Sequence, residues 1–497
     1  MTFDDWLPLL VVLSSLITGL LIFFVGEEQH RTRSWLNLIG AVAKLVLVGI
    51  MVWGVFQRHR YETRLPLLPD QDFVLRADAM GMLFVGLSSV LWLLTTIYAI
   101  GYLEGSPHRS RFFGFFSLCV TSTMGIALAG DLITFIIFYE LLTLSTYPLV
   151  VHRGTADALR AGKVYLQYTM TGGALLLVGV VWLYEVVGSV EFTERGVLAG
   201  VSVVDYPDLL AIFAILVAGL GVKTALVPLH GWLPVAMVAP APVSALLHAV
   251  AVVKAGAFGI VRIAYDVYGV EFAARLGVLD PLSWVAGITI VYGSVRALTQ
   301  DDLKRRLAYS TVGQVSYIVL GIGILGPLAT IGGVVHLVHQ GLMKITLFFC
   351  AGDLAETLGI HKISEMNGVG RRMPWSMVAF TVAALGMIGV PPVAGFVTKW
   401  YLGLGAIAAK DYWALAVLAV STVLNAAYFL PVLRRIWFLP ASGEWPKRER
   451  DQLETRPTLL VPTLITALLS LAAGLFAGSW FSPLGWAKLV TAREYVS

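Results

Sequence analysis

The chain has 497 residues, of which 58% are hydrophobic and only 13% are charged, and its formal net charge is +4. An ordinary soluble protein carries about 25% charged residues, so this composition excludes a soluble globular domain and requires surrounding lipid. The mild net charge gives no indication of a nucleic-acid partner. The sequence therefore predicts an integral membrane protein.

Sequence motifs for redox, metal or nucleotide chemistry are absent. The two cysteines, Cys119 and Cys350, fall in apolar spans and outside any C-x-x-C or Cys/His cluster, which gives no indication of a disulfide, iron–sulfur or zinc site. A Walker A loop, a dinucleotide fingerprint and a nucleophile elbow are also missing. We expect no cofactor, no metal and no catalytic residue, and leave open whether the chain belongs to an enzyme complex.

Apolar windows of about 20 residues predict about 14 membrane-spanning helices, and hence an all-α polytopic membrane protein. The first span follows Asp4 and Asp5 and is longer than a signal-peptide core, so we expect it to be retained. The predicted spans lie at 7–25, 36–56, 79–103, 112–129, 131–151, 163–188, 208–226 with a broken continuation to about 238, 241–265, 280–298, 308–325, 327–352, 374–405, 411–438 and 457–480.

The distribution of basic residues predicts the orientation of the chain. Loops after odd-numbered spans hold most of them, and loops after even-numbered spans hold few, apart from Arg58, Arg60 and Arg64. By the positive-inside rule, both termini face away from the cytoplasm. The basic residues after odd-numbered spans are Arg31, Arg33, Arg109, Arg111, Arg153, Arg160, Lys304, Arg305, Arg306, Arg371, Arg372, Arg434, Arg435, Lys447, Arg448 and Arg450, and acidic Glu191, Glu194 and Asp205 follow even-numbered spans.

Two apolar segments are interrupted by similar proline and glycine signatures. The run 228–232 in span 7 and the run 392–396 in span 12 share the pattern P-x-x-G-aromatic. Broken backbone at membrane depth is tolerated where it is buried in protein or lines a wet cavity. Corresponding breaks in two halves indicate an inverted-repeat transporter with sites near mid-membrane. The expected helix-breaking residues are Pro228, Gly231, Pro391, Pro392 and Gly395.

Glu140 and Lys223 are ionisable residues at mid-membrane positions of spans 5 and 7. Ionisable groups at this depth are functional by default, although a polar contact between helices is the alternative for Glu140. Lys223 is the most plausible partner of Glu140. Approach of the carboxylate would favour the charged lysine and its withdrawal would release the proton, so the pair would act as a gate.

The segment after the first break carries His230, His248 and Lys254. His248 precedes Lys254 by six residues, which puts the two on different faces of a regular helix. They could line one path only if span 8 is distorted, for which Gly256 and Gly259 give room. His248 alone is equally compatible with a satisfied interior histidine. Lys254 is the stronger candidate for a proton path.

Span 11 places His336, Gln340 and Lys344 on one stripe at i, i+4 and i+8, with His339 beside it. Such side chains can hold a file of waters and pass protons along it, and a structural polar seam between helices is the alternative.

In span 12, Lys399 follows the second break, which favours a wet half-helix end over snorkelling to the interface. Lys44 in span 2 is given no role.

Four runs of the sequence together resemble the antiporter-like subunits shared by complex I, Mrp-type sodium/proton antiporters and membrane-bound hydrogenases. They are DDLKRRLAYSTVGQVSY from Asp301, SALLHAVAVVKAG from Ser244, HLVHQGLMKITLFFCAG from His336 and GVPPVAGFVTKW from Gly389. The resemblance covers about span 4 to span 13. It implies 14 helices with two inverted five-helix repeats and discontinuous helices 7 and 12. The implied units are N-terminal helices in 1–110, repeats in 111–268 and 278–440, and a C-terminal helix and tail in 455–497.

The resemblance also implies roles for five residues. Glu140 and Lys223 match the gating pair, Lys254 the central lysine, His336 the span 11 histidine and Lys399 the terminal lysine or glutamate of the family.

The sequence departs from the family pattern at Gln340, where many relatives have a histidine and this chain has His339 one position earlier. We therefore expect the central relay to be routed differently. The chain ends soon after span 14, so we expect it to lack the long lateral helix of one complex I subunit. Its length and Lys399 resemble the D-type Mrp subunit or the corresponding complex I chain, whereas the span 8 run resembles the A-type subunit.

The leading hypothesis is a proton-conducting subunit of a multisubunit membrane complex of the Mrp cation/proton antiporter type, in the inner (plasma) membrane. Its expected partners are other membrane subunits, lipid, protons and, as one choice of exchanged cation, Na+. One alternative is a proton-pumping arm of a complex I-like dehydrogenase or a hydrogenase, and another is the energy-coupling subunit of an inorganic carbon uptake system. The expected proton path comprises Glu140, Lys223, His230, His248, Lys254, His336, His339, Lys344 and Lys399.

Overall fold

The structure is a computed structural model that describes residues 3–69, 71–188, 190–200, 207–441 and 454–495. Four residues used in the orientation prediction, Asp205, Lys447, Arg448 and Arg450, lie outside these ranges.

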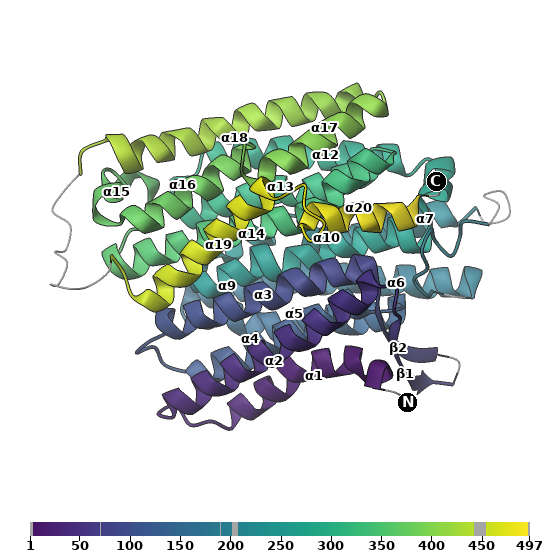
Figure 1. The fold of residues 1–497 in the computed structure, drawn as a ribbon, viewed down its shortest axis with the longest axis horizontal. Coiled ribbons are helices and arrows are strands. Elements are labelled where there is room, and N and C mark those ends of the chain that lie inside the picture. The colour runs from purple at the N-terminus through teal and green to yellow at the C-terminus, as the bar shows by residue number, and fades with distance from the viewer. Residues whose placement is uncertain (1–2, 70, 189, 201–206, 442–453, 496–497) are drawn as a thin grey trace.

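The described chain folds almost entirely into helices that run side by side (Figure 1). Most of them begin and end within a few residues of the predicted spans. The first half contains α1 (Phe3–Phe23), α2 (His30–Phe56), α3 (Ala79–Tyr102), α4 (Arg109–Leu128), α5 (Leu132–Val150), α6 (Ala156–Val187), α7 (Leu209–Thr224), α8 (Trp232–Val235), η1 (Ala236–Val238), α9 (Ala241–Ala245), η2 (Leu246–Val250), α10 (Val252–Arg262), η3 (Ile263–Val267) and α11 (Val270–Leu276).

The second half repeats the pattern of long helices interrupted by short ones. It contains α12 (Leu279–Leu298), α13 (Leu303–Gly323), α14 (Pro327–Leu358), η4 (Ile363–Glu365), α15 (Val369–Arg372), α16 (Pro374–Ile388), α17 (Ala394–Ala408), α18 (Tyr412–Phe438), α19 (Pro457–Leu475) and α20 (Pro483–Glu494).

Side-chain caps determine where several of these helices begin. Asp78, Asp131, Thr155, Asp302 and Asp411 each accept a hydrogen bond from the backbone N–H three residues later. An N-cap oxygen satisfies one of the backbone donors that the first turn of a helix leaves without a partner. The apolar windows locate the middle of a helix, and these polar residues set its first turn.

Ten described helical segments are long and apolar enough to cross a membrane. The bent pair formed by α11 and α12 makes an eleventh, with an angle of 90° between its two parts. Two shorter apolar helices, α7 and α16, precede the two predicted breaks. The chain is thus a multi-span helical protein, and the count of 14 spans stays a prediction.

A β-hairpin is the main departure from the all-helical expectation. Strands β1 (Tyr61–Leu68) and β2 (Gln71–Ala77) pair antiparallel, with Tyr61 opposite Ala77. Side chains alternate along β1, since Tyr61 and Thr63 are buried while Arg64 is exposed. This period of two is the signal of a half-buried strand, which a search for 20-residue apolar windows passes over.

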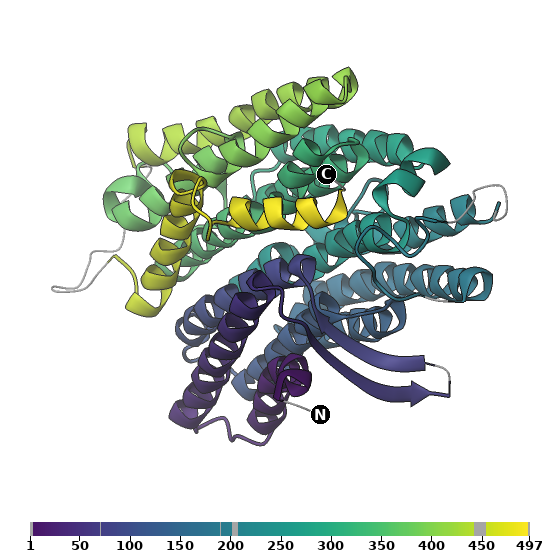
Figure 2. The same ribbon diagram turned by 45° about the vertical axis from the view of Figure 1, so that its right-hand side comes forward.

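The hairpin lies at the end of the bundle that also carries both termini (Figures 1 and 2). The last two helices, α19 and α20, cross the bundle and contact both α3 and α14. They thereby join the early helices to the later ones.

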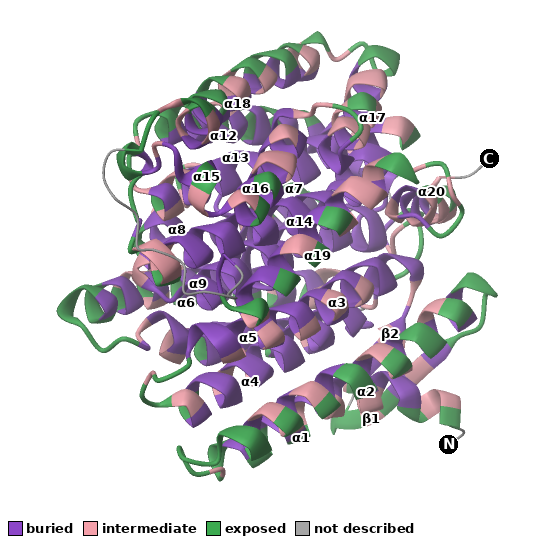
Figure 3. Cartoon of the chain, turned by 60° about the vertical axis from the view of Figure 1, so that its left-hand side comes forward, coloured by how far each residue is buried: buried purple, intermediate pink, exposed green. Residues whose placement is uncertain are grey.

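The two most deeply buried spans are α14 and the segment 241–267 that contains η2 and α10. Their apolar windows are wholly buried, whereas that of α6 is only 33% buried. Figure 3 shows the same contrast, with the exposed residues on outer helices such as α1, α2 and α18. The predicted path residues His248, Lys254, His336 and Lys344 therefore lie at the centre of the molecule.

Candidate functional site

The first break places Lys223 in the last turn of the half-helix α7. Its ammonium group donates a hydrogen bond to the carbonyl oxygen of Tyr139 on α5 and lies 3.3 Å from the centre of the Tyr139 ring. An aromatic face attracts a cation, and the C-terminal end of a helix favours positive charge. Lys223 is fully buried.

Glu140 follows Tyr139 on α5 and faces Gly173 of α6. Its Oε1 atom is buried and has no hydrogen-bond partner among the described residues. No salt bridge within 4.0 Å joins Glu140 to Lys223 in the described structure, so the predicted pair is adjacent through Tyr139 and not in direct contact. The glycine at 173 leaves the space that the carboxylate occupies.

Span 8 is distorted, as the placement of His248 and Lys254 on one path requires. A π-helical turn, η2, contains His248, and Ala251 interrupts the helix with φ −120° and ψ −81° before α10 begins. His248 stacks on Phe348 with ring centres 4.5 Å apart, and Lys254 donates to the carbonyl oxygen of Leu337 at 2.7 Å. Both contacts are on α14, so the two residues face the same neighbouring helix.

The position of the distortion differs from the prediction. Gly256 and Gly259, which were expected to permit it, lie within regular α10 and pack closely against Thr224 and Leu220 of α7. Their function in the fold is close helix packing. A π-helical turn is itself frequent at functional sites.

Thr398 on α17 connects the two histidines of α14. Its hydroxyl oxygen lies 3.2 Å from Nδ1 of His336 and 3.0 Å from Nδ1 of His339. A hydroxyl has a single hydrogen, so at most one ring can accept from it and the other must donate its own N–H. At least one of the two histidines therefore carries a proton on Nδ1.

Lys344 is the start of a second group of polar contacts. Its ammonium donates to Ser310 Oγ at 2.7 Å and to the carbonyl oxygen of Leu307 at 3.1 Å. The Tyr428 hydroxyl lies 2.8 Å from Ser310 Oγ, within hydrogen-bond distance. The same hydroxyl donates to Asn425 Oδ1 at 2.8 Å. Gln340, one turn before Lys344, donates to the carbonyl oxygen of His248 at 3.4 Å and so connects span 8 to this stripe.

Lys399 lies on α17, after the second break, and its side chain reaches the C-terminal end of the half-helix α16. Its ammonium donates to the last helical carbonyl, that of Ile388, at 2.6 Å and to Thr422 Oγ1 at 3.0 Å. Gly389 has φ +97°, and a side chain there would collide with the stem of Lys399. Lys399 lies 5.7 Å from the Tyr317 ring, and that ring lies 5.3 Å from His336. Lys223 thus lies before the first break, in the last turn of α7, whereas Lys399 lies after the second break, on α17.

His230 and Lys44 lie apart from these contacts. The ring of His230 packs edge-on against Tyr292, with centres 4.9 Å apart. Lys44 on α2 is fully buried, donates to Ser15 Oγ at 2.6 Å and lies over the Trp92 ring. His230 is therefore the predicted path residue that lies apart from the others, and Lys44, which was given no role, also lies outside them.

Three fully buried lysines, Lys223, Lys254 and Lys344, and the partly buried Lys399 share one property, and we call these four the lysine row. Among the described residues, none has a carboxylate within 4.0 Å, and each donates to a neutral oxygen. Burying a charge without a partner is costly, so such groups can lose their proton with little structural change. The described residues hold no metal-binding cluster.

A second buried cation, Arg262 at the end of α10, was not predicted as functional. It bonds Asp266 at 2.7 Å and both carboxylate oxygens of Asp78 at 2.7 and 2.9 Å, and we call these three residues the arginine cluster. The signal was visible in the sequence as Arg262 and Asp266 at i and i+4 inside an apolar span. Tyr139, Tyr317 and Thr398 were also missed, because contacts between distant helices leave no local pattern.

The chain is similar to known membrane proteins. A family model described as "NADH:quinone oxidoreductase/Mrp antiporter, TM" matches residues 129–425. The chain is 37% identical to the N-type subunit of the NADH-quinone oxidoreductase of Desulforudis audaxviator, over 82% of this chain and 83% of that one. It is 27% identical to the D-type subunit of the Na(+)/H(+) antiporter of Bacillus subtilis, over 96% of this chain and 94% of that one. Among solved structures, a chain of the Mrp complex from Dietzia sp. has the same fold, with a TM-score of 0.85, 23% identity, and 100% and 98% coverage.

Proposed function

Since the chain belongs to the NADH:quinone oxidoreductase/Mrp antiporter family, we propose that it is a proton-conducting, antiporter-like subunit of a multisubunit membrane complex. The preferred form is an Mrp-type exchanger of a monovalent cation for protons. The observation that carries the proposal is the lysine row, because three of its lysines are fully buried without a carboxylate partner, and ionisable groups inside a membrane are costly and usually functional.

The proposed path begins at the Glu140/Lys223 pair. A small movement of α5 against α7 would bring the carboxylate nearer to the lysine or take it away, and so change whether the lysine holds its proton. Lys254 would receive the proton next. The described hydrogen bonds do not join Lys223 to Lys254, so this step is proposed to run through water.

From Lys254 the path would run along α14 to Lys399. The two histidines that share Thr398 can exchange donor and acceptor roles, and the buried Nε2 atoms of both rings are free to bond water. Tyr317 lies between His336 and Lys399. Charge on one lysine alters its neighbours through the low dielectric of the interior, so protons would move in sequence.

The finer features of the fold are part of the same proposal. They are 14 spans, two inverted repeats at 111–268 and 278–440, and both termini on the non-cytoplasmic side of the plasma membrane. The common position of both termini at one end of the bundle supports this topology (Figure 1), as does the break that follows each of the two short helices α7 and α16.

A second candidate is a membrane-arm subunit of a redox-driven proton pump. The 37% identity to an NADH-quinone oxidoreductase subunit favours it. Gentle purification of the tagged chain from its native membrane would distinguish the two: hydrophobic antiporter subunits without redox centres favour cation exchange, and flavin or iron–sulfur subunits favour the pump.

The test of the proton path itself is Lys223→Ala in the intact complex, reconstituted into vesicles with a pH-sensitive dye. We expect proton flux to be lost. The matched control is Lys163→Ala, which removes an exposed lysine from α6 and should leave the flux unchanged. Normal flux in Lys223→Ala would refute the path.

A further inference from the structure

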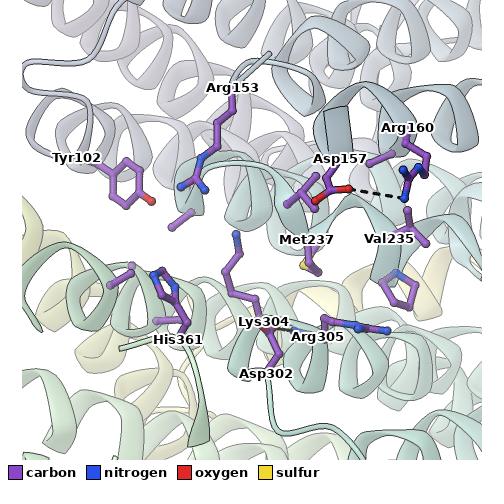
Figure 4. Close-up of a pocket in the computed structure, with 17 residues that line it drawn as sticks. Tyr102, Arg153, Asp157, Arg160, Val235, Met237, Asp302, Lys304, Arg305 and His361 are labelled. Carbon is purple, nitrogen blue, oxygen red and sulfur yellow. Dashed lines mark hydrogen bonds and ion pairs between the residues drawn. The ribbon is translucent and has the colours of Figure 1, made fainter. Parts of the chain in front are cut away.

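A cavity of about 410 Å³ lies at the end of the bundle opposite the termini, between the helices of the two predicted repeats. The N-terminal ends of α6 and α13, the short helices α8 and η1 and the C-terminal part of α14 form its walls. Its polar lining residues include Tyr102, Arg153, Arg160, Lys304, Arg305 and His361 (Figure 4). We call it the basic cavity.

The basic cavity has more cationic than acidic groups, and its two acids are already engaged. Asp157 lies 3.6 Å from Arg160, and Asp302 caps α13 by accepting the backbone N–H of Arg305 at 2.8 Å. No described carboxylate lies within 4.0 Å of the side chains of Arg153, Lys304 or Arg305. Arg153, Lys304 and Arg305 thus have no ion-pair partner among the described residues, and basic groups outnumber the two carboxylates of the cavity.

The orientation of these side chains favours one shared anion. Figure 4 shows Arg153 and Lys304 extending into the cavity toward one another, with Tyr102 and His361 beside them. Lys304 uses one of its three donors for the carbonyl oxygen of Ala239, at 2.5 Å, which leaves two for a ligand. Two like charges that face each other are unfavourable unless an anion lies between them.

Backbone groups add to the positive electrostatic potential of the basic cavity. Helices α6 and α13 both begin at the cavity, at Ala156 and Leu303. The N-terminal end of a helix carries a partial positive charge and free N–H groups, which favour phosphate. This contribution supports the side chains and would not define a site without them.

The apolar part of the cavity gives a route from the bilayer. Pro234, Val235 and Met237 line one wall. Val235 is 40% exposed, and Leu159 beside Arg160 is 52% exposed, on a flank of α6 that carries further exposed apolar residues. An acyl chain on this flank would hold its headgroup at the cavity, and basic pockets between membrane helices bind phosphate headgroups in this way.

We propose that the basic cavity binds a phosphate group. The phosphate comes from the headgroup of an anionic phospholipid or from free inorganic phosphate, which share this chemistry. Because α8 and η1 line the cavity and Trp232 of α8 donates to the carbonyl oxygen of Val222 in α7, a bound phosphate would hold the second half of the broken span 7 in place. The proposal concerns binding and does not depend on proton transport.

Binding can be measured on the full-length chain in neutral phosphatidylcholine nanodiscs. One arm titrates phosphatidylglycerol and counts retained lipid per chain by native mass spectrometry. The other arm titrates radiolabelled inorganic phosphate by equilibrium dialysis. We expect Arg153→Gln/Lys304→Gln to weaken binding about tenfold or more, because charge-assisted hydrogen bonds are lost. Lys304→Arg, which keeps the charge, should bind like the wild type.

The matched control is Arg371→Gln/Arg434→Gln, which removes two exposed arginines of α15 and α18 and should bind normally. Retention of lipid but not of free phosphate assigns the headgroup, and the reverse assigns the free ion. If the double variant does not fold, Arg153→Gln alone decides, and it should still weaken binding. Equal binding by the wild type and the cavity variants, or weakening by the control as well, would overturn the proposal.

Discussion

The arginine cluster and the lysine row both place cations inside the bundle, but different groups bond these cations. Carboxylates bond the arginine, and neutral oxygens bond the lysines. Arg262 is held by two carboxylates, Asp78 and Asp266, through two hydrogen bonds and one further ion-pair contact. Among the described residues, Lys254, eight residues earlier on the same span, donates only to a backbone carbonyl oxygen, that of Leu337. One span therefore carries a cation paired with carboxylates at its end and a cation without a carboxylate partner near its break.

This difference in bonding partners predicts different functions. We call the arginine cluster the anchor, because it fixes the position of the helix, and Lys254 the carrier, because it can exchange its proton. An arginine held by carboxylates stays charged and fixes geometry, because removing either partner leaves a buried charge uncompensated. A lysine bonded only to neutral oxygens can gain or lose a proton without leaving a counter-ion behind. Asp78 also caps α3, so the cluster attaches the end of span 8 to the start of another helix.

The largest expected effect comes from removing the anchor. Arg262→Met leaves two carboxylates facing apolar surroundings, and we expect a loss of about 3–5 kcal/mol in stability. Thermal unfolding of the purified chain in detergent measures it. The triple change Arg262→Met/Asp78→Asn/Asp266→Asn removes the charges together and should recover much of the loss. Unchanged stability of Arg262→Met would mean that the cluster is not an anchor.

Replacing Lys254 should lower the proton flux without lowering the stability. Lys254→Met deletes a buried charge that has no counter-ion, so the thermal stability should be unchanged or higher. Proton flux in reconstituted vesicles should fall by about 100-fold, the usual lower contribution of a positioned proton-transfer group. The comparison fails if Lys254→Met behaves like Arg262→Met, with stability and flux lost together.

A smaller effect is expected at the hydroxyl shared by the two histidines. Thr398→Val keeps the shape but removes the oxygen that both Nδ1 atoms contact. The loss of about one net hydrogen bond predicts a roughly five- to tenfold lower flux. Thr398→Ser restores the hydroxyl and serves as the control. If Thr398→Val conducts normally, the histidines pass protons without this oxygen.

The smallest effect is expected at an exposed ion network on the hairpin, which shows what an anchor contributes outside the bundle. The Arg64 side chain donates to Glu191 at 2.9 Å, and this hydrogen bond lowers the pKa of the Glu191 carboxyl. A lowered pKa means that the stabilisation is present above the ordinary glutamate pKa of about 4.3 and is lost as the pH falls through the folded value.

Glu191→Gln should therefore increase hydrogen exchange in residues 61–77 at pH 7 by no more than about fivefold, since exposed pairs contribute about 1 kcal/mol or less. The wild type should approach the variant in strong acid. Glu271→Gln, on the exposed part of α11, is the control. A difference between the wild type and Glu191→Gln that persists in strong acid would exclude the carboxylate as its cause.

The sequence predicted the parts of this fold that depend on local composition. Long apolar windows located the spans, and the proline and glycine signatures located the ends of α7 and α16 at Thr224 and Ile388. The hairpin was missed because its period-two pattern is short. The predicted need for a distortion in span 8 is confirmed, but the π-helical turn lies at 246–250, before the glycines that were expected to cause it.

The candidate site was only partly predictable for a related reason. Ionisable residues such as Lys254 stand out in an apolar span, so their identity can be read directly. Their neutral partners do not stand out, because Thr398 and Tyr317 are ordinary residues whose importance comes from contacts 59–62 and 19 positions away in the chain. Tertiary packing selects these partners, and one sequence carries no record of it.

The π-helical turn at 246–250 also makes the length of span 8 significant. Each residue of a regular helix advances the chain by about 100°, and a π-turn accommodates one additional residue within the helix. Deleting a single residue there would restore regular hydrogen bonding but rotate everything from Val252 onward by that angle. Arg262 is bonded to Asp78 on another helix, so the far end of the span resists such a rotation. Changes in the number of residues should therefore be tolerated far less in this turn than substitutions of similar size.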